Sequence, residues 1–223
     1  MKRTLICAAL VAAFSAPAAM ANQAGDFVVR FGATTVAPND DSGKVVVDAL
    51  GTTGMEVSVD NNTQLGLNFA YFFTPNWAVE VLAATPFSHD INLQMSELGL
   101  GDGKLAETKH LPPTISALYY FNSPESKFQP YVGAGINYTI FFDDNFTDAR
   151  EDQTFQSLEL DDSFGLSAQL GIDYELENNW LVNASIRYID IDTEADFEVA
   201  GSKASVDVDI DPWVYTLSVG YRF

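Results

Sequence analysis

Apolar residues recur at every second position in eight segments of this chain, most clearly in the last one. There the apolar positions are Trp213, Tyr215, Leu217, Val219, Tyr221 and Phe223, and the residues between them include Thr216, Ser218, Gly220 and Arg222. Side chains of a β-strand point to opposite faces in turn, so this period predicts a strand with one apolar and one more polar face. Residues 213–223 are therefore predicted to form a strand.

The same period predicts seven earlier strands, at residues 27–33, 65–73, 77–83, 115–121, 128–138, 163–174 and 180–188. Their connections alternate in length. Short turns lie at 74–76, 122–127 and 177–179, whereas long connections rich in Gly, Asp and Asn lie at 38–56, 88–108 and 143–160, with a shorter one near 199–204. This alternation is typical of outer-membrane barrels. The predicted fold is all-β: an eight-stranded antiparallel, up-and-down transmembrane β-barrel with long extracellular loops and short periplasmic turns.

Aromatic residues gather at one predicted end of this barrel. An even number of strands places both chain ends and the short turns on the periplasmic side. The aromatic residues near these turns are Phe73, Trp77, Phe121, Phe128, Tyr174, Trp180 and Phe223. A girdle of this kind is expected where aromatic rings meet lipid head groups, so it favours a membrane barrel over a soluble sandwich.

The first 21 residues have the three regions of a secretory signal peptide. Lys2 and Arg3 precede an uncharged apolar run, and small residues end at Ala21. We therefore predict a cleaved signal peptide at residues 1–21 and a transmembrane β-barrel domain at residues 22–223. The only cysteine, Cys7, lies in the signal, so the mature chain has no thiol for a disulfide or a metal. The predicted location is the outer membrane of a Gram-negative bacterium.

Acidic residues dominate the charge of the mature chain. Removing Lys2 and Arg3 leaves 9 basic residues against 31 acidic ones, a net charge of −22. This balance argues against nucleic acid as a partner, because nucleic acid needs clustered Lys and Arg. Most of the acidic residues are interpreted as solvated loop charge. The acidic strings at 190–196 and 207–211 offer carboxylates two residues apart, which is compatible with divalent cations but matches no closed calcium loop.

The sequence predicts neither a catalytic site nor a cofactor. Ser88, His89 and Asp90 are adjacent in sequence, but the members of a catalytic triad must converge in space. His89 and His110 are the only histidines, and two histidines without supporting spacing are weak evidence for a metal site. The protein is therefore not expected to be an enzyme.

Several ordered sequence blocks resemble the OmpW family of outer-membrane proteins, including its alkane-uptake relatives of the AlkL type. The blocks are Asn61–Leu67, Glu80–Phe87, His110–Thr114, Tyr131–Tyr138, Asp211–Trp213 and Gly220–Phe223. The resemblance covers the mature chain and implies a narrow, largely apolar lumen used for passive uptake of small hydrophobic or amphipathic molecules. It also implies lipid, lipopolysaccharide and the barrel assembly machinery as partners, and colicins or phages, for which some members are receptors.

The inward positions of the predicted strands divide into a charged and an apolar set. An eight-stranded barrel is just wide enough for side chains, so we do not expect a water-filled pore. We call the charged inward residues of the periplasmic half and mid-depth the polar floor: Arg30, Glu80, Asp173, Glu175 and Arg222. The predicted channel residues are Arg187, at mid-depth like Arg30, and the apolar inward residues toward the extracellular end: Leu82, Ala84, Ile189, Ile191, Val206, Val208 and Ile210. The resemblance matches Leu82 to a lumen-narrowing position and Arg187 to a position where a relative carries Trp.

Three prolines predict a weak place between the third and fourth strands. Pro86 lies near the upper end of one strand and Pro112 and Pro113 at the start of the next, and proline cannot donate a ladder hydrogen bond. We call these three residues the lateral seam and expect a solute to leave the lumen through it into the membrane. The alternative is a non-conducting structural or receptor barrel that binds colicins, phages or surface ligands through its acidic loops.

Overall fold

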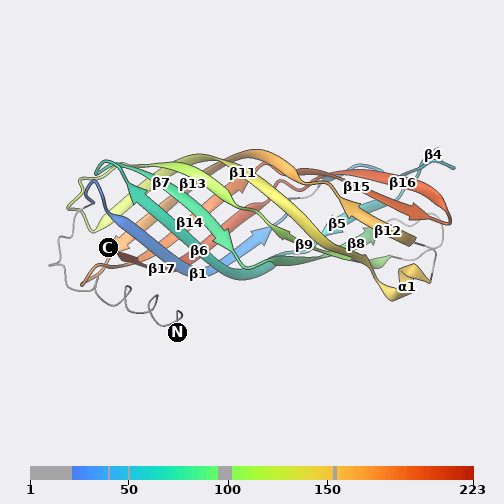
Figure 1. Cartoon of the computed structure of the whole chain (residues 1–223), viewed down its shortest axis with the longest axis horizontal. Helices are drawn as coiled ribbons and strands as arrows, with labels where there is room; N and C mark the ends of the chain where they lie inside the picture. The colour runs from blue at the N-terminus through green and yellow to red at the C-terminus, as the bar shows by residue number, and fades with distance from the viewer. Residues whose placement is uncertain (1–21, 40, 50, 95–101, 153–154) are drawn as a thin grey trace, which may run out of the picture.

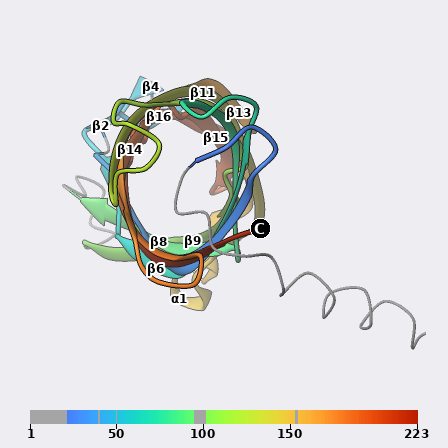
Figure 2. The ribbon, with the colours of Figure 1, turned by 90° about the vertical axis from the view of Figure 1, so that its left-hand side faces the viewer.

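Eight strands close into an antiparallel barrel in the computed structural model, which describes residues 22–39, 41–49, 51–94, 102–152 and 155–223. In ring order they are β1 (Phe27–Ala37), β6 (Asn62–Phe72), β7 (Trp77–Ala84), β10 (Thr114–Tyr120), β11 (Phe128–Phe146), β13 (Ser163–Glu175), β14 (Trp180–Ile189) and β17 (Trp213–Arg222). Pairing of β1 with β17 and of β10 with β11 completes the ring, which Figure 2 shows end-on. The predicted fold is confirmed.

The two-residue period places side chains as the sequence predicts. Along β17, side chains are alternately exposed and buried from Trp213 onward. Leu217 on its outer face is 64 % exposed, whereas its neighbour Ser218 is 4 % exposed and points into the barrel. A large apolar side chain left uncovered by protein is stable where lipid covers it, so the outer face of the barrel is the membrane face.

A second part of the structure extends the barrel at the end away from the C-terminus and the start of β1 (Figure 1). Beyond the barrel, the 19-residue β11 carries β9 (Gly103–Leu111), β8 (Phe87–Gln94) and β5 (Glu56–Val59) in one continuous sheet. A second sheet contains β12 (Phe155–Leu160), β15 (Asp192–Val199), β16 (Ser202–Asp209), β3 (Val46–Val47) and β4 (Gly51–Thr52), and β2 (Asp41–Ser42) pairs with β16. Helix α1 (Asp148–Glu151) is a single short turn. We call these elements the extracellular extension.

The extension gives the predicted long connections a strand structure that the sequence did not predict. Much of residues 88–108 and 143–160 is strand, as is the chain between β14 and β17. The reason is visible in β16, where Val206 and Val208 are buried while Asp207 between them is exposed. The acidic residues that suggested solvated loops thus form the outer face of strands whose inner face is apolar.

The interior of the molecule holds three apolar clusters at successive depths. The lowest cluster contains Phe72, Tyr120 and Leu181 near the periplasmic end. The middle cluster includes Phe87 and Ile189, and the upper one fills the extension. No helix among the described residues is long and apolar enough to cross a membrane. The predicted signal peptide, residues 1–21, lies outside the described residues and stays a prediction.

Candidate functional site

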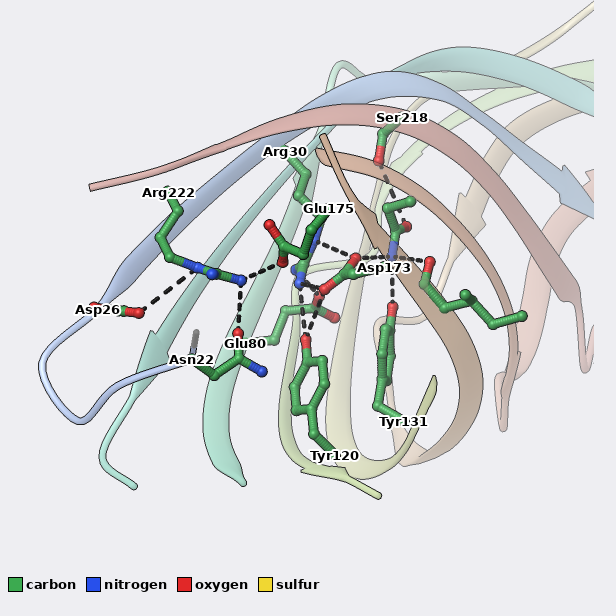
Figure 3. A network of polar contacts seen from close by, with 12 residues as sticks. Asn22, Asp26, Arg30, Glu80, Tyr120, Tyr131, Asp173, Glu175, Ser218 and Arg222 are labelled. Atoms are coloured by element: carbon green, nitrogen blue, oxygen red, sulfur yellow. Dashed lines mark hydrogen bonds and ion pairs between the residues drawn. The ribbon is translucent and has the colours of Figure 1, made fainter. Parts of the chain in front are cut away.

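A buried arginine on the first strand organises the charged residues at the periplasmic half of the barrel. The Arg30 side chain is fully buried and donates from Nε and Nη2 to the two Asp173 carboxylate oxygens, at 3.2 and 2.5 Å. Its Nη1 donates to Glu80 at 3.1 Å and its Nη2 to the Tyr120 hydroxyl at 2.8 Å. Figure 3 shows these contacts converging inside the barrel. Arg30 thus links two other residues of the polar floor, Glu80 and Asp173.

A second arginine ties the network across the full width of the barrel. Arg187 lies on β14 and Glu80 on β7, which are opposite each other in the ring of eight strands. Arg187 Nη2 donates to Glu80 Oε1 and to Gln169 Oε1, both at 2.6 Å, and Gln169 donates to Glu80 at 3.0 Å. These hydrogen bonds join opposite walls of the barrel across the lumen. Arg187, which the sequence grouped with the channel residues, therefore belongs with the polar floor.

The remaining floor residues close the barrel nearer its periplasmic end. Arg222 on β17 forms ion pairs with Glu175 and, at 3.6 Å, with Asp26. It also donates to the Asn22 side chain at 2.6 Å. Each floor guanidinium therefore has a carboxylate partner, as a buried charge requires, because an unpaired ion in such a site costs several kcal/mol, about 3–5 when one partner is removed. The charged side chains of the polar floor are thus joined in ion pairs inside the barrel.

Above the floor lies an apolar cavity that extends into the extracellular extension. Its cavity volume is about 60 Å³, and it is partly open to solvent. Its lining includes Val45, Val57, Ile91, Leu105, Phe146 and Val206. No charged side chain lines it among the described residues, and its polar side chains are two threonines and two histidines. Such a cavity suits an apolar solute with few polar groups.

The structure distributes the predicted channel residues over three levels. Ile191, Val206, Val208 and Ile210 line the apolar cavity. Ile189 and Ala84 pack in the middle apolar cluster beneath it. Leu82 is buried on β7, and its strand partner on β10 is Thr114. Val206 and Val208 lie on β16, which is separate from β17, so they do not continue the last barrel strand as the sequence suggested.

The lateral seam coincides with an interruption of the strand ladder. The last pair between β7 and β10 is Leu82 with Thr114, and the next pair, between β8 and β9, is Phe87 with His110. Among the described residues no strand pair joins 83–86 to 111–113. The backbone groups turn to outer neighbours instead: Thr85 N donates to Leu65 O at 3.0 Å, and Tyr138 N donates to Pro113 O at 3.1 Å.

Two buried histidines lie side by side in the wall of the cavity. His89 and His110 stack with ring centroids 4.9 Å apart, and His110 also contacts Phe87 and Phe141. The sequence did not predict that the two rings are in contact, because the segment between them was expected to be a loop. The hairpin of β8 and β9 is what places them on one inward face. The alternation of Phe87, His89 and Ile91 was the available signal.

The other groups considered for chemistry point in different directions. Ser88 donates to Glu107, whereas His89 bonds the Asp60 carbonyl and Asp90 pairs with Lys104, so the three consecutive residues do not converge.

In the acidic strings, carboxylate oxygens of Asp190, Asp192 and Asp211 lie within 4.8 Å of one another on the surface. Asp211 already accepts from the Tyr188 hydroxyl at 2.7 Å.

Acidic pH should weaken the extension through His110. Burial, and then the neighbouring His89, lower the pKa of His110 from 6.5 to about 3. The unfolded state therefore binds more protons than the folded state between these values, so stability falls as pH drops below about 6.5. We expect the urea midpoint to fall less between pH 7 and pH 5 in His110→Phe than in the wild type. Equal pH dependence in the two proteins would contradict the assignment of a buried, neutral imidazole.

Comparison with known proteins gives consistent matches. The OmpW family model matches residues 23–223. Outer membrane protein W of Vibrio cholerae is 48 % identical over 224 residues, covering all of both chains. The crystal structure of OprG from Pseudomonas aeruginosa superposes with a TM-score of 0.86 at 44 % identity, covering 92 % of this chain and 99 % of that one. The solid-state NMR structure of AlkL gives 0.68 at 27 % identity, covering 94 % and 95 %.

Proposed function

The chain belongs to the OmpW family of bacterial outer-membrane barrels, and we propose that it admits small hydrophobic or amphipathic molecules passively from outside the cell. The family resemblance and the outer-membrane location predicted from the sequence are confirmed. The protein therefore lies in membrane lipid and lipopolysaccharide. Its uptake activity, its solutes and its route are the proposal.

The observation that supports this proposal is an apolar cavity above a closed polar floor. The cavity lining carries no charged side chain among the described residues, so a solute with few polar groups enters without leaving a charge unpaired. Below the cavity and the middle apolar cluster, Glu80 pairs with Arg30 and Arg187 across the lumen. A solute that reaches the bottom of the cavity meets the floor and requires another exit.

The lateral seam is the exit that we propose. The cavity reaches His110, the residue that forms the first strand pair above the interrupted ladder. At the interruption, Pro86, Pro112 and Pro113 have no N–H to donate, so separating the two strands here breaks few hydrogen bonds. The solute then passes from the cavity into the hydrocarbon of the outer membrane, where its free energy is low.

Filling the cavity should abolish uptake. Ala195 lines the cavity from β15, and the variant Ala195→Trp places a large side chain in the solute's space. We expect the rate of naphthalene transfer into proteoliposomes to fall to the rate of protein-free vesicles. The control is Ala184→Trp on the exposed, membrane-facing side of β14, which should keep the wild-type rate. If wild-type protein does not accelerate the transfer of several apolar solutes, a non-conducting receptor barrel replaces this proposal.

A further inference from the structure

The two cavity histidines present buried polar atoms that nothing in the described protein satisfies. His89 Nε2 and His110 Nδ1 are buried and have no hydrogen-bond partner among the described residues. The two side chains are 2 % and 6 % exposed, and both line the otherwise apolar cavity. A buried polar atom without a partner costs free energy, so such atoms point to a missing water or ligand.

The protonation of His89 follows from its one hydrogen bond. Its Nδ1 lies 2.5 Å from the Asp60 carbonyl oxygen. A carbonyl oxygen only accepts, so Nδ1 carries the proton and donates it. Burial lowers the pKa of His89 below its ordinary value, which keeps the ring neutral. In a neutral imidazole with a protonated Nδ1, Nε2 is a bare acceptor. This atom therefore requires a donor from outside the described protein.

The neighbouring His110 narrows the class of ligand. Its Nδ1 is unpaired and belongs to a ring stacked on His89, so a ligand group bound at His89 would also lie near the His110 ring. A hydroxyl group both donates and accepts, which allows it to donate to His89 Nε2 and to pair with His110 in either tautomer. An ammonium or carboxylate group meets no opposite charge in the cavity lining and is disfavoured by burial.

We propose that His89 and His110 form the polar end of the solute site and select neutral apolar molecules that carry a hydroxyl group, such as alcohols and phenols. The inference rests on the proposed uptake function, because it assigns a solute class to the same cavity. The hydroxyl lies against the two imidazoles and the hydrocarbon part lies among the aliphatic and aromatic side chains above. The matched hydrocarbon, which lacks the donor, leaves His89 Nε2 unsatisfied and binds more weakly.

The probes are 1-naphthol and naphthalene, which differ by one hydroxyl group. Binding is read from the imidazole ¹⁵N resonances of the full chain in lipid nanodiscs, and the two histidines are the only residues with an imidazole. We expect 1-naphthol to shift the Nε2 resonance of His89 and naphthalene to leave it in place. In proteoliposomes we expect wild-type protein to favour 1-naphthol over naphthalene, relative to protein-free vesicles, by about three- to tenfold, as one hydrogen bond allows.

Variants separate recognition from folding. His89→Phe removes the acceptor and should lower the preference to about one. His89→Phe also removes the hydrogen bond to the Asp60 carbonyl, which could disturb β8. In that case His110→Phe tests the site, because the His110 side chain forms no hydrogen bond with the described residues. The control Ala184→Val lies on the membrane-facing side of β14, away from the cavity, and should keep the preference.

The outcomes distinguish the inference from the function on which it rests. Equal handling of both probes, no shift at His89 and no effect of either variant would overturn the hydroxyl site while leaving uptake intact. A shift at His89 without protein-dependent transfer would support the site and refute uptake.

Discussion

Replacing Glu80 by alanine is expected to destabilise the barrel by about 3–5 kcal/mol, because it removes one partner of a buried ion-pair network. Glu80 accepts from Arg30, Arg187 and Gln169, which come from β1, β14 and β13. Without it, Arg187 has no carboxylate partner among those described. Urea unfolding in lipid vesicles, followed by tryptophan fluorescence, measures the loss.

The same variant should also raise the ion permeability of proteoliposomes above that of the wild type. The bond from Arg187 to Glu80 crosses the lumen, and its removal leaves hydrated space between opposite walls. Glu80→Gln is the matched control, since it keeps an acceptor of the same size and should have smaller effects on both measurements. Wild-type stability and permeability in Glu80→Ala would show that the floor is not held by this residue.

Replacing Pro86 by valine is expected to slow the uptake of an apolar solute severalfold while the barrel stays folded. Valine restores a donor N–H at the interrupted ladder, between the pair Leu82 with Thr114 and the pair Phe87 with His110. With an added hydrogen bond between the two strands, the strands should separate at the seam less often. The triple variant that also changes Pro112 and Pro113 should slow uptake further, because it adds two more donors.

Pro130→Val is the control for the seam variants. Pro130 lies on β11 toward the periplasmic end, opposite Ile172 on β13 and away from the seam. The substitution is chemically the same and should leave the transfer rate unchanged. Electrophoretic mobility with and without heating verifies that each variant is folded. Wild-type uptake in the folded triple variant would refute lateral exit.

The barrel strands could be predicted from the sequence because each has a distinct outer and inner face. Phe164 and Leu166 are exposed on the outer face whereas Ser163 and Ser167 face the interior, and this contrast is strong in the sequence. The charged floor residues stood out for the same reason. Arg30 and Asp173 interrupt the inner face of strands whose outer face is apolar, so their meeting inside the lumen could be anticipated.

The extension and the bonding partners of Arg187 could not be predicted from periodicity alone. In β15 and β16 the outer face is acidic and solvated, so Asp and Glu made these strands resemble loops. The depth of a side chain in the barrel depends on the register between strands. That register pairs Arg187 with Gln169, and the Arg187 side chain forms an ion pair with Glu80. The stacking of His89 on His110 likewise depends on a hairpin that the sequence did not reveal.

The most direct test of the account compares the uptake of naphthalene in Glu80→Ala and Pro86→Val proteoliposomes under the same conditions. In the proposed route the solute leaves above the floor and through the seam. We therefore expect that opening the floor leaves the rate of naphthalene uptake unchanged, whereas strengthening the seam lowers it. Faster uptake in Glu80→Ala together with a wild-type rate in Pro86→Val would place the solute's path through the lumen and contradict lateral exit.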